Sequence, residues 1–256
     1  MKKTPSKSRA VAPRDASADR RKFLTRGITV AGAAAAGAAL PARAADPIGK
    51  EYPAWATVMG KPLSGYGQPS KFEEPVKRYA ASGYGTLAPG TGSARTPLEK
   101  LEGVITPNGL HFERSHNGIP EIDPAKHKLL IHGLVKRPLM FSLAELARYP
   151  MVSRMHFVEC SGNSSTNAVA VEPPQGSAGL IHGLVSCADW TGIPLGLLLD
   201  EAGVEPTGKW LLAEGADSAS MSRSLPIEKA YEDAIVALYQ NGERLRPENG
   251  YPVRLL

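Results

Sequence analysis

Apolar residues recur at short, regular spacings after residue 97, and these spacings predict an alternation of strands and helices. Strands are predicted over 128–135, 151–159, 209–213, 233–240 and 251–256, where apolar residues alternate with polar ones or form short runs. Helices are predicted over 143–148 and 194–202. Ser142 and Glu145 have the spacing of a capping box at the start of the first helix, and Gly203 is placed to end the second.

The stretch before residue 97 has a different pattern. Prolines and glycines interrupt residues 46–97 at short intervals, which predicts an extended arm with one short helix near 75–81.

Two features near the end of the chain add to this picture. Asn241-Gly242 is a strong turn signal between the last two predicted strands. The chain then ends inside the apolar run 251–256 with no turn, cap or polar tail, and we therefore expect it to be a fragment of a longer protein.

The composition and the charge narrow the classes of function. A chain of 256 residues with 42% hydrophobic content can bury a sizeable core, which excludes disorder throughout. The net charge of +5 suggests nucleic-acid binding at first sight, but residues 1–45 hold ten Lys or Arg and two acids. The remaining residues hold 20 basic and 23 acidic side chains, so no nucleic-acid partner is expected.

Residues 1–45 have the order of a secretory signal. The pair Arg20-Arg21 precedes Lys-Phe-Leu, an uncharged Ala/Gly-rich stretch follows over 27–40, and small residues lie at 42–45. This order predicts a twin-arginine signal peptide, which exports proteins already folded, and hence a periplasmic location. The alternative is a membrane anchor, but the apolar stretch is shorter than the roughly 18 residues that a spanning helix needs. We expect no membrane span once the signal is cleaved.

The two cysteines, Cys160 and Cys187, are too few for a structural four-cysteine zinc site. Cys160 follows the predicted strand 151–159 and precedes the small polar residues 161–165, a position where a side chain can meet a bound ligand. Its thiolate would suit a soft or high-valent metal. An inert buried cysteine and a disulfide with Cys187 are the alternatives from the residues alone.

Several segments, taken in order, resemble the sulfite oxidase family of molybdenum enzymes. The similar segments are 105–108 (ITPN), 112–116 (FERSH), 120–124, 159–163 (ECSGN), 190–195, 214–218, 241–242 and 251–254. The resemblance spans residues 98–256 and implies an α+β fold with mixed sheets and flanking helices, here an incomplete molybdopterin-binding oxidoreductase domain. The family's C-terminal dimerisation domain would lie beyond Leu256, which implies a homodimer or a heterotetramer.

The resemblance also implies the site residues. Cys160 would ligate molybdenum, and Asp217 would accept hydrogen bonds from the pterin of the molybdenum–molybdopterin cofactor. Arg114 would contact the cofactor or an anionic substrate. The segment that holds the pterin would comprise Phe112, Glu113, Arg114, Ser115 and His116. Without the resemblance, Arg114 would be interpreted as a surface charge and Asp217 as a turn residue.

Two departures from the family pattern bear on the substrate. Ser164 and Ser165 replace two arginines, one of which helps to bind sulfite, and Ser115 replaces an asparagine. The loss of a guanidinium removes a charge-assisted contact, so free sulfite is a less natural substrate. The likeness is greatest to the sulfane dehydrogenase branch of the family, in periplasmic sulfur-oxidising systems. It implies that sulfur on a carrier protein is oxidised and that electrons pass to a c-type cytochrome.

Two alternatives stay open. A sulfite dehydrogenase or a methionine-sulfoxide-reducing relative would use the same cofactor. A cofactor-free, exported binding or assembly module is an alternative of another class, and a Cys160–Cys187 disulfide would favour it.

Overall fold

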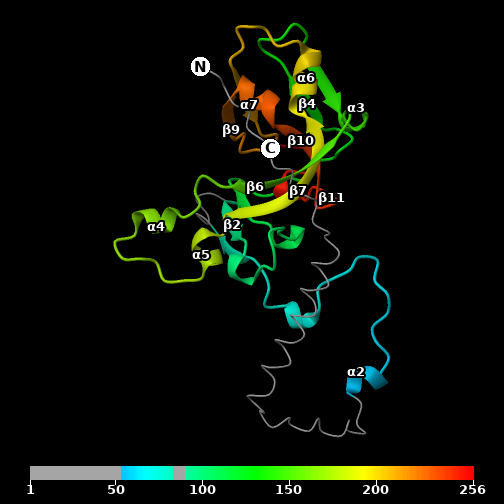
Figure 1. Ribbon diagram of the computed structural model, residues 1–256, viewed down its shortest axis with the longest axis vertical. Helices are drawn as coiled ribbons and strands as arrows, with labels where there is room; N and C mark the ends of the chain where they lie inside the picture. The colour runs from blue at the N-terminus through cyan, green and yellow to red at the C-terminus, as the bar shows by residue number, and fades with distance from the viewer. Residues whose placement is uncertain (1–52, 83–89) are drawn as a thin grey trace, which may run out of the picture. The chain divides into compact units, whose positions relative to one another are not determined.

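The computed structural model describes residues 53–82 and 90–256 (Figure 1). The predicted signal over 1–45 therefore lies outside the described residues. Contacts divide the chain into two units, Met1–Gly67 and Gln68–Leu256. In the first unit the described residues contain one short helix, α2 (Ala54–Thr57), and expose their apolar side chains, with Trp55 85% exposed. None of the helices in the described part of the chain is long and apolar enough to cross a membrane.

A three-stranded antiparallel sheet begins the second unit. It consists of β1 (Tyr79–Ser82), β2 (Gly92–Arg95) and β3 (Glu113–Ser115), in that order. The helix predicted near 75–81 is wrong, because Tyr79 pairs with Arg95 and Ser82 with Gly92 across the sheet. This pairing partner is distant in sequence, and local proline spacing carries no information about it. The division by contacts thus places residues 68–97 of the predicted arm with the second unit.

The main sheet has the order β11-β10-β7-β6, and β12 also pairs with β10. Its strands are β6 (Val152–Glu159), β7 (Val185–Pro194), β10 (Ile235–Gln240), β11 (Glu243–Arg244) and β12 (Arg254–Leu255). β6 runs antiparallel to β7 with Val152 opposite Gly192 and Glu159 opposite Val185. This register sets the end of β6, and with it Cys160, beside the start of β7.

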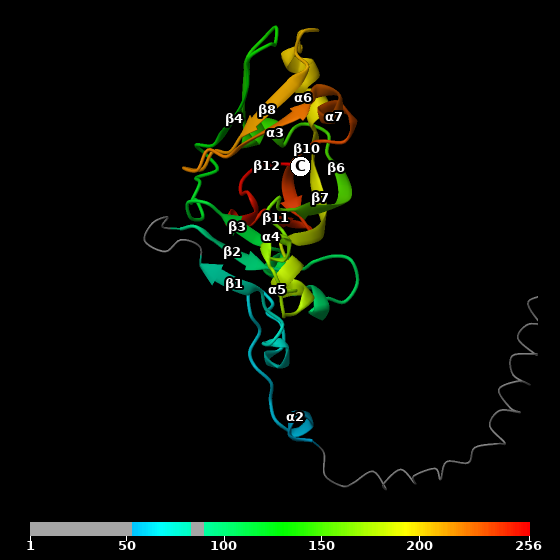
Figure 2. The ribbon, with the colours of Figure 1, turned by 90° about the vertical axis from the view of Figure 1, so that its left-hand side faces the viewer.

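Smaller elements surround this sheet. Two ribbons pair β4 (Lys128–Ile131) with β5 (Leu139–Ser142) and β8 (Trp210–Glu214) with β9 (Ser222–Pro226). The helices are α3 (Leu143–Leu146), α4 (Ser165–Val169), α5 (Ala178–His182), α6 (Leu195–Ala202) and α7 (Ile227–Glu232). Short 3-10 turns are η1 (Lys71–Glu73), η3 (Leu98–Lys100), η4 (Asn108–Leu110) and η5 (Pro247–Asn249). Figures 1 and 2 show α6 and α7 at one end of this unit and α4, α5 and β2 at the other.

Core side chains cover both faces of β10, inside the main sheet. Alternate residues of β10 divide between two clusters: Val236 and Leu238 pack with α6, whereas Ile235 and Ala237 pack with Trp190. Because neighbouring residues of a strand point to opposite faces, this division shows that β10 is buried on both sides. β6 exposes one face, with Met155 and Phe157 toward solvent. The antiparallel sheets and the separate short helices make the fold α+β, as expected.

Most of the predicted elements are present. The capping box at Ser142 is formed in both directions, with Glu145 N–H donating to Ser142 Oγ and Ser142 N–H donating to Glu145. Gly203 ends α6 in the left-handed conformation. The strand predicted over 251–256 is shorter than expected, because Tyr251 N–H bonds back to Arg246 O after η5 and regular pairing starts at Arg254.

Candidate functional site

Cys160 is the first residue after β6 and opens a loop, residues 160–165, which we call the Cys160 loop. The thiol is half-buried. Its Sγ accepts the N–H of Gly162 at 3.4 Å, and its carbonyl accepts the N–H of Asn163 at 2.8 Å. These short-range bonds curl the loop around the sulfur, as expected for small residues after a strand end.

The Cys160 loop is fastened to residues 182–184, which connect α5 to β7. Cys160 N–H donates to Leu184 O at 2.9 Å, and Leu184 N–H donates to Asn163 Oδ1 at 3.0 Å. Ser164 Oγ lies 2.6 Å from His182 Nδ1. The position of the thiol thus depends on the seam between the end of β6 and the start of β7.

Both cysteines are free thiols. Cys187 lies opposite Phe157 in the β6–β7 register, three residues before Cys160. At about 3.4 Å per strand residue this offset exceeds the Cα separation that a disulfide can span. The predicted alternative of a Cys160–Cys187 bridge is therefore wrong for this fold, and Cys160 is a free thiol.

Residues 112–116, which include β3, are five of the predicted site residues. Arg114 pairs with Ser93 in β2 and donates from Nη1 to the carbonyls of Gly92, at 3.2 Å, and Ser115. His116 is exposed, and its carbonyl accepts from Thr91 Oγ1 at 2.9 Å. The hydroxyl of Ser115 is buried and has no partner among the described residues. A buried hydroxyl without a partner is costly, so this atom is suited to a bound polar group.

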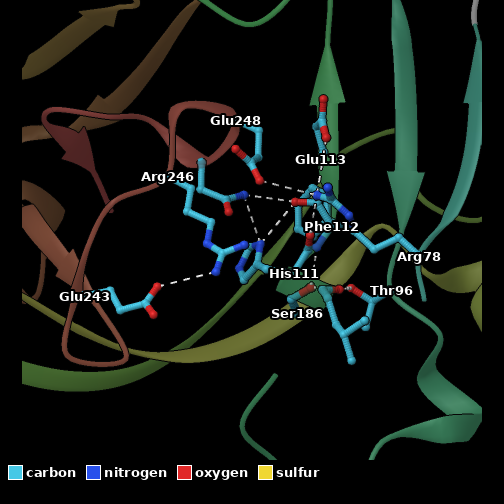
Figure 3. A network of polar contacts seen from close by, with 11 residues as sticks. Arg78, Thr96, His111, Phe112, Glu113, Ser186, Glu243, Arg246 and Glu248 are labelled. Carbon is cyan, nitrogen blue, oxygen red and sulfur yellow. Dashed lines mark hydrogen bonds and ion pairs between the residues drawn. The ribbon is translucent and has the colours of Figure 1, made fainter. Parts of the chain in front are cut away.

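Glu113 and Phe112 make their contacts with other residues of the chain. Glu113 forms an ion pair with Arg78 at 3.3 Å, and burial raises the pKa of Glu113, with the Arg78 cation opposing and Glu248 adding to the shift. Phe112 is buried, and its N–H donates to Ser186 Oγ at 3.0 Å. The side chain of Phe112 stacks on His111 with ring centroids 5.3 Å apart. Figure 3 shows these contacts together.

Asp217 lies in the turn between β8 and β9, where its carbonyl accepts the N–H of Ser220 at 3.0 Å. The next residue, Ser218, receives a hydrogen bond from Asn117 Nδ2 at 2.6 Å. The structure therefore brings the turn that contains Asp217 beside Asn117, which follows the 112–116 segment. Thr96, which follows β2, contacts the segment that holds the Cys160 loop. Its N–H donates to Gly183 O at 2.8 Å, and its hydroxyl lies 2.6 Å from Ser186 Oγ.

A buried polar centre lies behind β3, and sequence reasoning missed it. We define it as His111, Ser186, Asn249 and Arg254. Asn249 Nδ2 donates to Phe112 O at 3.1 Å and contacts His111 Nδ1 at 3.3 Å. Burial, with the Arg254 and Arg78 cations adding to it, lowers the pKa of His111 to about 4, against the opposing effect of the hydrogen bond to Phe112 O. Its imidazole is therefore neutral at neutral pH.

Arg254, which is half-buried, adds a cation to the buried polar centre. Its Nη1 donates to Asn249 O at 2.9 Å, and its guanidinium lies 5.5 Å from the centroid of the Trp190 ring. Desolvation of the guanidinium lowers the pKa of Arg254 to about 10. Among the residues that the structure describes, no carboxylate lies within ion-pair distance of Arg254. A desolvated cation without a counter-ion is unfavourable, so this site is suited to a bound anion.

These residues fit a phosphate-bearing pterin cofactor with one protein thiolate. Arg254 offers charge to a phosphate, whereas the unpaired Ser115 Oγ and Asn249 Oδ1 offer hydrogen-bonding capacity to a polar ring. A charged residue inside the apolar run 251–256 is the sequence signal that could have identified Arg254. His111 and Asn249 give no such signal, because burial makes them distinctive and the pattern around them is ordinary.

A family model and several relatives match this chain. The model described as "Oxidoreductase molybdopterin binding domain" matches residues 116–256. The nitrate reductase [NADH] of Ulva prolifera is 33% identical over 172 residues, which are 60% of this chain and 19% of the relative. The nitrate reductase [NADPH] of Phytophthora infestans is 31% identical over 176 residues, which are 64% and 19%. The chain thus spans about a fifth of the length of these curated relatives.

A solved structure matches more of the chain. The sulfane dehydrogenase SoxCD from Paracoccus pantotrophus superposes with a TM-score of 0.76 and 40% sequence identity. The match covers 82% of this chain and 54% of that chain. Together with the family match, these values confirm the expected fold.

Proposed function

The chain belongs to the oxidoreductase molybdopterin-binding domain family, the expected sulfite oxidase family, and we propose that it is an exported molybdenum enzyme that oxidises sulfur. Molybdopterin is its cofactor and oxidoreduction its reaction class. Our proposal concerns the finer points: sulfane sulfur on a carrier protein as the substrate, a c-type cytochrome as the electron acceptor, and the periplasm as the location.

The likeness to a sulfane dehydrogenase carries the choice of substrate. The 40% identity extends over 82% of this chain, whereas the nitrate reductases are 31–33% identical over 60–64%. The Cys160 loop supports the same choice, because Ser164 and Ser165 supply no guanidinium for a small, doubly charged anion. One hydrogen bond to a charged group contributes about 1.5–3 kcal/mol, so free sulfite should bind less tightly than it would beside an arginine.

The assigned residues would divide the work as follows. Cys160 would give its thiolate to the metal, and Arg254 and Ser115 would hold the anionic and polar parts of the pterin. Arg114 and His116, at the accessible end of β3, would contact the cofactor or an anionic substrate, and the carboxylate of Asp217 would accept from pterin N–H groups. The bound cofactor would supply the two-electron oxidation, while the protein supplies position and electrostatics.

Export and partners follow from the same proposal. The Arg20-Arg21 leader would carry the folded, cofactor-loaded protein out of the cytoplasm. A sulfur-carrier protein would deliver the substrate and a cytochrome would remove electrons, since the matched solved structure is a dehydrogenase. The oligomer would be a homodimer or a heterotetramer.

The experiment that tests the function is molybdenum per polypeptide, measured on the complete reading frame expressed in a cofactor-producing host. We expect near-stoichiometric metal in the parent. Cys160→Ser should lower turnover by more than about 100-fold, because even the partners around metal ligands contribute 10–100-fold. Cys187→Ser is the matched control and should leave metal and turnover unchanged. A parent without molybdenum, in a host whose pterin pathway works, would favour the cofactor-free module.

Comparison of electron donors tests the substrate. Carrier protein loaded from thiosulfate should be oxidised with a higher kcat/KM than free sulfite, with cytochrome c as acceptor. Faster oxidation of sulfite would indicate a sulfite dehydrogenase. Reduction of methionine sulfoxide or of nitrate by the reduced enzyme, without oxidation of either sulfur donor, would contradict the proposal.

A further inference from the structure

The third fastening point of the Cys160 loop is a hydrogen bond between two side chains. Ser164 Oγ and His182 Nδ1 are 2.6 Å apart, and both residues are half-buried. The other two fastening points use the backbone of Cys160 and Leu184 or the amide of Asn163. The two other hydrogen bonds already hold the backbone of the loop in place. The Ser164–His182 hydrogen bond is therefore not needed for that purpose and is available for another role.

Ser164 adopts a backbone conformation that serine rarely takes. Its φ is 59°, in the left-handed region, which costs conformational energy for a residue with a Cβ. Such conformations persist where the surrounding structure enforces them and are common at functional sites. In this conformation Ser164 forms the hydrogen bond to His182. The two side chains therefore fix each other's orientation.

The second ring nitrogen of His182 has a different environment. No hydrogen bond joins Nε2 to any residue that the structure describes, and Nε2 is not among the enclosed polar atoms without partners. The carboxylate of Glu159, at the end of β6, accepts from Asn163 Nδ2 at 2.9 Å. None of the ion pairs among the described residues includes His182. An accessible imidazole nitrogen thus lies beside the thiol loop without a protein partner.

The hydrogen bond also fixes what this nitrogen can do. When the Ser164 hydroxyl donates to Nδ1, the ring proton resides on Nε2, which becomes an outward N–H donor. In that tautomer, an accessible N–H donor next to the Cys160 loop is suited to the anionic end of a ligand.

We infer that His182, oriented by Ser164, is a substrate-binding residue that donates from Nε2 to the anionic end of the sulfur substrate beside Cys160. The inference rests on the proposed function and specifies one of its contacts. Ser164 is a positioning residue in this arrangement. The ligand class is a sulfur anion, with negative charge on a terminal sulfur or on a sulfur-bound oxygen.

Two isosteric substitutions separate binding from positioning. In His182→Asn the side-chain amide can replace Nδ1 toward Ser164 but does not reach the position of Nε2. In His182→Gln the amide can place an N–H near Nε2 but loses the bond to Ser164. Ser164→Ala removes the same bond from the other side. Ser165→Ala is the control, because Ser165 is exposed, lies next to Ser164 and takes no part in the pair.

The probe is sulfate, an oxyanion of sulfur that cannot be oxidised further, titrated calorimetrically into the cofactor-loaded full chain. We expect His182→Asn to bind sulfate roughly tenfold more weakly, the effect of one hydrogen bond to a charged group. His182→Gln should bind it within about twofold of the parent, since it keeps a donor. The KM for the thiosulfate-loaded carrier protein should follow the same order, with kcat little changed.

Amide hydrogen exchange over residues 160–165 of the same loaded proteins reports positioning. His182→Gln and Ser164→Ala should exchange faster than the parent, whereas His182→Asn and Ser165→Ala should not. Unchanged sulfate affinity in His182→Asn, or equal weakening in the Asn and Gln variants, would overturn substrate binding by His182. A parent that does not bind sulfate would overturn it as well.

Failure of the two proposals can be told apart. If the parent lacks molybdenum or oxidises no sulfur donor, the proposed function fails. If the parent is loaded and oxidises sulfur, and His182→Asn matches it in sulfate affinity and in KM, only the role of His182 fails.

Discussion

The buried polar centre and the Cys160 loop are both polar, but they are held in opposite ways. His111, Ser186 and Asn249 are enclosed, and their hydrogen bonds join segments far apart in the chain. The Cys160 loop keeps its serines and glycine accessible and is fastened mainly to one neighbouring segment, 182–184. Burial makes each bond of the first region consequential for folding, whereas exposure leaves the second region free to meet ligands.

This difference predicts which substitutions change stability and which change binding. Changes in the buried polar centre or in the seam below the loop should lower the free energy of unfolding. Changes within the Cys160 loop should alter metal content or ligand affinity and leave unfolding nearly unchanged. Three predictions test that division.

The largest effect is expected at Gly183, in the seam itself. A Cβ there would meet the carbonyl oxygens of Gly179 and Thr96 well inside van der Waals contact, and both are backbone atoms that cannot move freely. Gly183→Ala should therefore lower the free energy of unfolding by roughly 3 kcal/mol or more, as measured by urea denaturation.

Gly162→Ala, inside the Cys160 loop, is the matched control. The added Cβ would lie 3.8 Å from Cys160 Sγ, an ordinary contact, so unfolding should change by less than about 1 kcal/mol. Equal destabilisation by the two alanines would break the division between seam and loop.

An effect of intermediate size is expected from the titration of His111. Its pKa is about 4 in the folded protein, below the ordinary value of 6.5, because burial disfavours the charged ring. The unfolded chain therefore binds a proton between these two values and the folded protein does not, so stability falls as the pH falls from about 6.5 to 4. The loss should be at most about 3 kcal/mol for this group.

His111→Gln tests that assignment, because glutamine does not titrate. Urea denaturation at several pH values from 7 to 4 should show a shallower loss of stability in the variant than in the parent. Parallel pH profiles for the two proteins would show that another group accounts for the acid sensitivity.

The smallest effect is expected in a region that belongs to neither side of the comparison. Ser142→Ala removes the capping box of α3 and should lower the free energy of unfolding by about 1 kcal/mol. Molybdenum content and sulfate affinity should stay as in the parent, since α3 contributes none of the assigned site residues. A loss of molybdenum in this variant would show that cofactor retention follows global stability and not the local site.

Neighbouring residues alone predicted the helix cap and the hairpin turn, because both are formed by residues close together in the sequence. The spacing of Ser142 and Glu145 predicted a cap that the structure forms, and Asn241-Gly242 predicted the turn that joins β10 to β11. Both residues of that turn have positive φ, 50° and 78°, the conformation that Asn and Gly tolerate best.

Long-range pairing decided the elements that the pattern missed. β7 is the central strand beside Cys160, yet Gly192 and Pro194 make its sequence look like a loop. Gly192 is present because β10 passes so closely that a Cβ would meet Val236 O. The residues around His111 and Arg254 were missed for the same reason, because burial by distant segments gives them their chemistry.

The enclosed indole of Trp190 provides an optical reporter. Trp190 is fully buried, donates from Nε1 to His156 O at 3.2 Å, and lies edge-on to His111 with centroids 5.5 Å apart. Trp55 and Trp210 are 85% and 64% exposed, so their fluorescence resembles that of indole in water. Trp190 therefore supplies the short-wavelength part of the emission, and its shift to longer wavelength on denaturation, or its quenching by a bound pterin, reports directly on the interior next to Arg254.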